Sequence, residues 1–245
     1  MGLLERARRL LSAIMTRRPS DPDEAAADGL PDTLRRDLLD RYRAGFDDRV
    51  QVLAERLGQG ELSPREFIAQ MRIEVRTLHI FGMAAGKGGF TNLSAADSEA
   101  IERAVREQFR YLERWGRQLE QMSTLNAAQV GNRARLYGGA ANETLERAAD
   151  VAVGLPTLPF YPGKDTECMT NCGCRWRRVK LEGYRNWDCY WVRSKDDSCR
   201  TCIAREQMCN PLRVRGGQVM PVAGAELVFR RNKGLGGPRR VRAGG

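Results

Sequence analysis

Apolar residues recur every three or four positions through the first two thirds of the chain, which is the period of an amphipathic α-helix. The longest run covers residues 34–57 and should end near Gly58, because glycine commonly stops helices. A second helix is expected after Ser63, which is followed by Pro64 and then by Glu66, the pattern of a capped helix start. The pattern therefore predicts two long helices joined by a short turn.

Two further helices are expected in the same part of the chain. The second helix should stop in the glycine-rich turn at residues 86–89, and Ser94 with Asp97 offers the next capped start. Apolar residues at helical spacing then continue to Leu119. A last helix, over about residues 126–150, is rich in Ala and Gly, so it is suited to close packing against a neighbour.

Beyond Cys174 the pattern changes. Residues 175–194 are rich in Trp, Tyr, Val and Arg, and Gly183 lies near their middle. Aromatic and β-branched residues on both sides of a glycine turn are typical of a β-hairpin. The sequence therefore predicts an α+β fold, in which a mainly helical body is followed by a small cysteine-rich β module.

The seven cysteines of the chain all fall between Cys168 and Cys209. The spacings C-x3-C and C-x2-C place sulfur atoms on tight turns about 3.5–4 Å apart, which suits a tetrahedral ion with Zn–S bonds of about 2.3 Å. Two cysteine turns joined by a hairpin form the plan of a zinc ribbon, so we expect one structural Zn²⁺ per chain. The candidate ligands are Cys168, Cys172, Cys174, Cys199 and Cys202.

The spacing leaves open which four of these five thiols bind the ion. The C-x2-C pair is the firmest, and Cys174 is a rival for either place in the C-x3-C pair. Cys189 and Cys209 are expected to be buried thiols. The alternative to a metal site is a set of disulfides or free thiols. The odd number of cysteines disfavours disulfides, and so does an N-terminus without the continuous apolar core of a secretory signal.

The first 18 residues predict an amphipathic helix that is held away from the body. Residues 19–31 are acidic and rich in Pro and Ala, which is typical of a flexible linker. We therefore expect the helix to dock on a partner, with a membrane surface or its own domain as alternatives. No run of 18 apolar residues exists, so no membrane span is expected. The docking stripe is formed by Leu3, Leu4, Leu10, Leu11 and Ile14.

The net charge of +10 is concentrated in the C-terminal third. From Arg175 onward the chain has 17 basic and 6 acidic residues, whereas residues 1–174 have 24 and 25. Such a surface meets phosphate backbone or an acidic protein face, or is simply solvated. The tail, residues 230–245, has no acid and is broken by Gly and Pro. We expect it to contact double-stranded DNA without sequence preference, through Arg230, Arg231, Lys233, Arg239, Arg240 and Arg242.

These patterns divide the chain into an N-terminal helix (1–18), a linker (19–31), a helical domain (32–153), a cysteine module (154–229) and the basic tail (230–245). No arrangement of catalytic residues stands out. His79 is the only histidine and lies in the middle of a helix with no nucleophile pattern nearby. We therefore interpret it as structural, and we expect neither an enzyme nor a small-molecule substrate.

Two neighbouring motifs carry a family resemblance. Leu158-Pro159-Phe160-Tyr161-Pro162-Gly163 leads into Cys168-Met169-Thr170-Asn171-Cys172-Gly173-Cys174-Arg175-Trp176, and a C-x2-C turn follows a Trp-containing strand. This succession resembles the minor head proteins of tailed bacteriophages, the head morphogenesis group related to the phage Mu F-like family. The resemblance spans about residues 34–210. Gly173 and Arg175 depart from the pattern, which often has Arg at the first position and His or another polar residue at the second.

The resemblance implies a non-enzymatic virion component that is made in the bacterial host cytoplasm and lies inside the phage head near the portal. Its implied partners are the portal protein and capsid or scaffold components. Its implied work is head assembly, with DNA packaging or ejection as a further role. The alternative is a cellular zinc-ribbon protein that binds nucleic acid, which aromatic residues on a basic strand face would favour.

Overall fold

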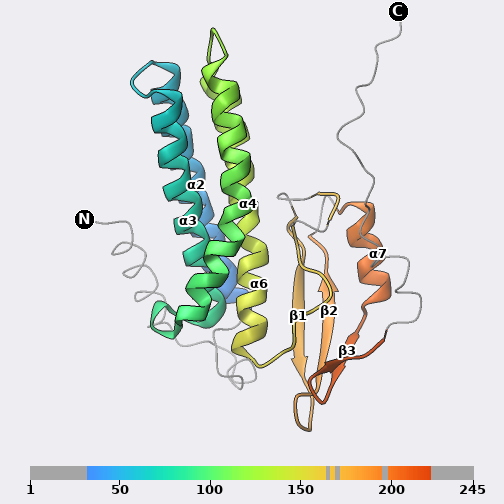
Figure 1. The fold of residues 1–245 in the computed structure, drawn as a ribbon. Coiled ribbons are helices and arrows are strands. Elements are labelled where there is room, and N and C mark those ends of the chain that lie inside the picture. Colours follow the sequence, from blue (N-terminus) through green and yellow to red (C-terminus); the bar gives the residue numbers. More distant parts are fainter. Residues whose placement is uncertain (1–31, 164–165, 169–171, 195–197, 222–245) are drawn as a thin grey trace, which may run out of the picture.

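The computed structural model describes residues 32–163, 166–168, 172–194 and 198–221. Figure 1 shows a bundle of long helices beside a small antiparallel sheet, and a short helix lies on the other side of the sheet. The expected α+β fold is confirmed. The expected N-terminal helix with its linker (1–31) and the basic tail (230–245) lie outside the described residues. No helix in the described ranges combines the length and apolar character that crossing a bilayer requires.

Three long helices form most of the bundle, at the positions that the apolar pattern predicts. They are α2 (Asp32–Gly58), α3 (Pro64–Lys87) and α4 (Ala95–Glu120), and a short 3₁₀ turn, η2 (Phe90–Asn92), joins the last two. Their facing sides bury one apolar core, to which Phe46, Phe67 and Trp115 each contribute a fully buried or nearly buried ring. The apolar faces that the sequence pattern predicts for these helices therefore pack against one another.

Local signals fix where α3 and α4 begin. The side chain of Ser63 accepts the backbone N–H of Glu66, and the Glu66 carboxylate accepts the backbone N–H of Ser63. Ser94 and Asp97 form the same reciprocal pair at the start of α4. Both expected capping boxes are present, and each satisfies N–H groups that the first helical turn leaves without a partner.

The single helix expected over residues 126–150 is instead three elements. They are α5 (Ala127–Arg135), a 3₁₀ turn η3 (Leu136–Ala140) and α6 (Ala141–Ala152). Gly138 and Gly139 weaken the helix at η3, and a Cβ at Gly138 would lie 3.3 Å from the Phe46 ring. After this break α6 packs closely on α3, because a Cβ at Gly86 would come within 2.5 Å of the Ala148 Cβ.

The sheet is a four-stranded antiparallel meander in the order β1-β2-β3-β4. Its strands are β1 (Arg175–Lys180), β2 (Trp187–Val192), β3 (Leu212–Arg215) and β4 (Gln218–Val219), with α7 (Arg200–Met208) between β2 and β3 in the chain. The predicted hairpin is β1 with β2, in which Trp176 pairs with Trp191. Because strand side chains alternate, both tryptophans lie on the inner face of the sheet and are buried.

The loop that precedes the cysteines packs on that inner face. The Phe160 ring lies 5.4 Å, between ring centroids, from both Trp176 and Trp191. The Trp176 indole N–H donates to the Phe160 carbonyl at 3.0 Å. With buried Cys189 and Leu212, these rings form a second apolar core, separate from that of the bundle.

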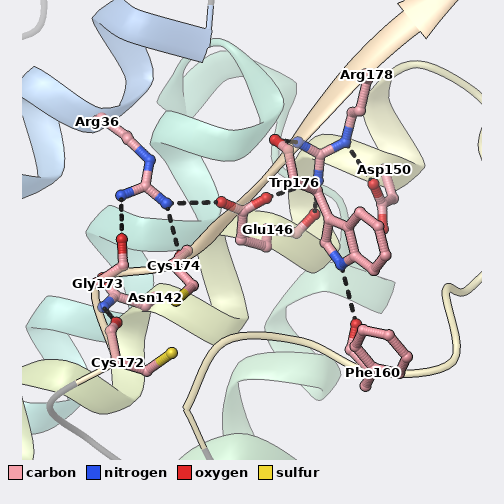
Figure 2. A network of polar contacts seen from close by, with 10 residues as sticks. All are labelled: Arg36, Asn142, Glu146, Asp150, Phe160, Cys172, Gly173, Cys174, Trp176 and Arg178. Atoms are coloured by element: carbon pink, nitrogen blue, oxygen red, sulfur yellow. Dashed lines mark hydrogen bonds and ion pairs between the residues drawn. The ribbon is translucent and has the colours of Figure 1, made fainter. Parts of the chain in front are cut away.

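A buried polar network joins the sheet to the bundle (Figure 2). The guanidinium of Arg178 on β1 forms ion pairs with Glu146 at 2.8 Å and Asp150 at 2.6 Å, both on α6. Arg36 on α2 donates to the other oxygen of Glu146, and the Tyr161 hydroxyl donates to the other oxygen of Asp150. All four carboxylate oxygens therefore have a donor, which offsets the cost of burying two acids.

This network makes Arg178 the side chain whose loss should weaken the union of sheet and bundle most. In the variant Arg178→Ala, Glu146 and Asp150 stay buried, at 3% and 2% side-chain exposure, without their shared cation. Removing one partner of a buried pair costs about 3–5 kcal/mol. Urea unfolding followed by far-UV circular dichroism should show a loss of this size.

The matched control is Arg193→Ala. The Arg193–Glu206 ion pair has side chains 38% and 31% exposed, and pairs of this kind contribute about 0–1 kcal/mol. Equal losses for the two variants would show that the buried network does not hold the two parts together.

Candidate metal centre

Three thiols lie together where the loop before β1 meets the start of α7. The Cys202 sulfur is 3.9 Å from that of Cys168 and 3.7 Å from that of Cys172, and all three lie within 4.8 Å of one another. Sulfur atoms at the corners of a tetrahedron with bonds of about 2.3 Å are about 3.8 Å apart. The three thiols thus fit three corners of a tetrahedral site and could hold a metal ion.

Two more thiols border this cluster and compete for the fourth corner. The Cys199 sulfur lies 3.5 Å from that of Cys168, whereas the Cys174 thiol interacts with those of Cys172 and Cys202. The structure therefore gathers all five candidate ligands, while which four bind stays a prediction. The thiols of Cys189, on β2, and Cys209, just after α7, are buried in the module core and do not belong to this cluster.

The second cysteine pair lies on a helix start rather than on a plain turn. Cys199 is the residue before α7, and Cys202 lies in its first turn. Burial favours a higher pKa for Cys199, but N–H groups of Cys202 and Cys168 near its sulfur outweigh burial and lower the pKa. A helix N-terminus stabilises a thiolate in this way, so α7 supplies part of the electrostatics of the site.

The pKa values of the clustered thiols are shifted in opposite directions. Hydrogen bonds from Cys174 and Cys202 lower the pKa of Cys172, and the same contact with Cys172 raises the pKa of Cys202. Burial raises the pKa of Cys168 to about 11. The protons of adjacent thiols thus stabilise one thiolate, and a metal ion would take the place of those protons.

The helical body holds the turn that carries two of the sulfurs (Figure 2). The Asn142 side chain of α6 donates to the Cys172 carbonyl at 3.0 Å. Arg36 of α2 donates to the carbonyls of Gly173, at 3.4 Å, and Cys174, at 3.0 Å. Three consecutive carbonyls of the turn are therefore fixed by the bundle, and such contacts orient the ligands of metal sites.

His79 contributes to packing at a distance from this cluster. Its side chain is buried on α3, and its Nδ1 lies 2.7 Å from the Thr144 hydroxyl of α6. Burial lowers the pKa of His79 to about 4, so the ring is neutral at pH 7. The contact with Thr144 places His79 in the packing between α3 and α6, while its Nε2 has no hydrogen-bond partner among the described residues.

Comparison with protein-family models finds no match, and searches of curated proteins and of solved structures find none either. The function proposed below rests on the motifs and the geometry of this chain.

Cys202 has the most neighbours in the thiol cluster, so its loss should empty the site. Protein purified under reducing conditions should carry about one metal ion per chain, and Cys202→Ser should carry close to none. The sheet and α7 should loosen, because metal binding in small sites is largely folding energy. Metal content measured by mass spectrometry, with circular dichroism for the helices, checks this.

Cys189→Ala is the matched control, because Cys189 is buried in the same module but lies on β2 outside the thiol cluster. It should keep the metal. If wild-type protein contains no metal and its thiols are joined as disulfides, the cluster is not a metal centre.

Proposed function

We propose that the chain is a non-enzymatic minor head protein of a tailed bacteriophage, which acts at the portal vertex in head assembly and has one structural zinc ion. The ion ties its cysteine module together. The observation that carries the proposal is the place of the family-like motif in the fold. Three of its described residues, Phe160, Tyr161 and Cys172, lie at the joint between the helical body and the cysteine module.

The loop of the motif supports this proposal through specific contacts. The hydroxyl of Tyr161 accepts the Leu158 backbone N–H at 2.9 Å and donates to Asp150 at 2.5 Å. Phe160 accepts the Trp176 indole N–H, and Asn142 holds the Cys172 carbonyl. Each half of the motif thus contacts α6 or β1, so the resemblance rests on residues that define the architecture.

Zinc is the metal that this donor set favours. Thiolate ligands in a tetrahedral arrangement select Zn²⁺ or iron–sulfur centres, and sulfur separations of 3.5–3.9 Å match a single ion with bonds of about 2.3 Å. We propose Cys168, Cys172, Cys199 and Cys202 as its ligands, with Cys174 as the spare thiol. A bound ion would fasten the start of α7 to the loop before β1.

The proposed partners would bind two segments that lie outside the described residues. The apolar stripe of residues 1–18 would dock on the portal or a neighbouring capsid or scaffold protein. The basic tail, residues 230–245, would follow the phosphates of packaged double-stranded DNA. The proposed location is the interior of the phage head, close to the portal.

The alternative, a cellular zinc-ribbon protein that reads nucleic acid, has less support from the structure. Base recognition in single strands relies on exposed aromatic rings. Trp176, Trp187 and Trp191 are all at most 5% exposed. Tyr190 on the outer face has the Arg177 guanidinium 4.6 Å from its ring centroid, so the sheet lacks an open stacking platform.

The test of the head-protein proposal is incorporation into heads assembled with the portal, scaffold and capsid proteins encoded beside the gene. Wild-type protein should enter these heads, and the double variant Leu10→Asp with Leu11→Asp should not. An isolated 18-residue helix needs a partner surface to bury its stripe, and two buried carboxylates would oppose that burial. Quantitative mass spectrometry of purified heads measures the outcome.

The control is Val52→Asp with Ile73→Asp, which places the same charges on apolar side chains that are 53% and 51% exposed in the body. This variant should enter heads normally. Exclusion of the wild-type protein from heads, or a gene with no portal and capsid genes beside it, would contradict the proposed function. Entry of the Leu10 and Leu11 variant would move the docking surface to the helical body.

A further inference from the structure

One exposed face of α4 carries a stripe of arginines. Successive members are three, four, four and three residues apart, so at about 100° per residue they fall within an arc of about 80°. With a rise of about 1.5 Å per residue the stripe is about 21 Å long. It consists of Arg103, Arg106, Arg110, Arg114 and Arg117, all of them exposed.

Most glutamates of α4 form ion pairs with arginines of α3 and so do not neutralise the arginine stripe. Three of its glutamates pair across to arginines of α3 and thereby line the seam between the two helices. The pairs are Arg65 with Glu120, Arg72 with Glu113 and Arg76 with Glu102. The arginines of α3 neutralise these acids. The arginine stripe lies next to this seam, on the side of α4 that faces solvent.

Few carboxylates neutralise the positive charge of the arginine stripe. Arg103 lies 3.7 Å from Glu99, and both side chains are more than 60% exposed, so this pair is weak. Among the described residues, the other four arginines form no ion pair with any carboxylate. Glu99 precedes the stripe at its N-terminal end and Glu107 lies just outside its arc, so the part of the stripe from Arg106 to Arg117 remains strongly positive.

The chemistry of the stripe favours a phosphate backbone. All of its cations are arginines, whose planar fork binds phosphate oxygens in pairs. A lipid surface would need an exposed apolar face on α4, but Ile101, Val105 and Leu112 are buried in the body. A protein partner would need apolar anchors, and Tyr111 is the large apolar side chain of this helix that is exposed.

We propose that α4 is a binding surface for double-stranded nucleic acid, which it contacts through phosphates without reading sequence. This inference deepens the proposed contact with packaged DNA and rests on it. It places a second contact on the rigid helical body, independent of residues 230–245. A duplex is preferred over a single strand because the stripe lacks the stacked aromatic rings that single strands require.

The experiment measures the affinity of the full chain for a 30-base-pair duplex at several salt concentrations. The stripe variant replaces Arg106, Arg110, Arg114 and Arg117 by Gln. Each phosphate contact contributes about 0.9 to the slope of log affinity against log salt. The stripe variant should therefore lose about two to four units of slope and bind at least about tenfold more weakly near 0.1 M salt.

A control variant removes the same four charges from other faces, by replacing Arg41, Arg177, Lys180 and Arg213 with Gln. These side chains are exposed and form no ion pair with the described carboxylates. The control should change the slope by less than about one unit. Circular dichroism and metal content should be unchanged in both variants, since none of the eight side chains is buried.

An unchanged slope in the stripe variant overturns the proposal, as do equal losses in the two variants, which would indicate a response to net charge alone. Wild-type protein that binds phosphatidylserine vesicles but no duplex also overturns it. None of these results touches incorporation into heads, which is measured separately. Failure of the α4 surface is thereby distinguished from failure of the head-protein proposal.

Discussion

Two buried carboxylates on α6, Glu146 and Asp150, determine how the rest of the molecule is put together. An unpaired buried charge costs several kcal/mol, so the fold must bring cations to both. Arg178 on β1 forms ion pairs with both carboxylates and thereby holds the sheet against the bundle. Arg36 on α2 pairs with Glu146 as well, and the same guanidinium holds the carbonyls of Gly173 and Cys174. The acids of one helix thus position the turn that carries two of the clustered thiols.

This arrangement shows where a metal ion would strengthen the module. The sheet is small, and its core consists of three tryptophans, Phe160, Tyr161, five buried cysteines and four aliphatic residues. Small modules of this kind usually need a disulfide or a metal to be stable. The bundle holds the Cys172–Cys174 turn from one side, while Cys202 brings the start of α7 from the other. A metal bound between them would complete a continuous connection from α2 and α6 to α7.

Local features of the sequence predicted the long helices and the first hairpin, but not the division of residues 126–150, the strands β3 and β4, or the contacts between elements. Helix periodicity, the caps at Ser63 and Ser94 and the hairpin around Gly183 depend on near neighbours, and they appear as expected. The cysteine spacing likewise predicted the thiol cluster. The network was missed because Arg36 lies 110 residues from Glu146 and 138 from Cys174. The sequence did hold one local sign of the network, because Asn142, Glu146 and Asp150 recur every four residues and so form a polar line on one face of α6.

Counting charge over long segments hid the arginine stripe of α4. Residues 1–174 are nearly neutral in sum, yet the ion pairs with α3 place much of the acidic charge of α4 in the seam. A helical wheel of α4 alone would have revealed the stripe. The break between α5 and α6 was also missed. It depends on the approach of Gly138 to Phe46, which lies on a different helix.

The central claim is that the thiol cluster is a single-metal centre that completes the joint between bundle and module. X-ray absorption at the zinc edge, on full-length protein purified under reducing conditions without added metal, tests it most directly. The account predicts one zinc per chain with four sulfur neighbours at about 2.3 Å. A shell containing nitrogen or oxygen from outside the cluster, or metal-free protein whose sheet and helices are already fully folded, would contradict it.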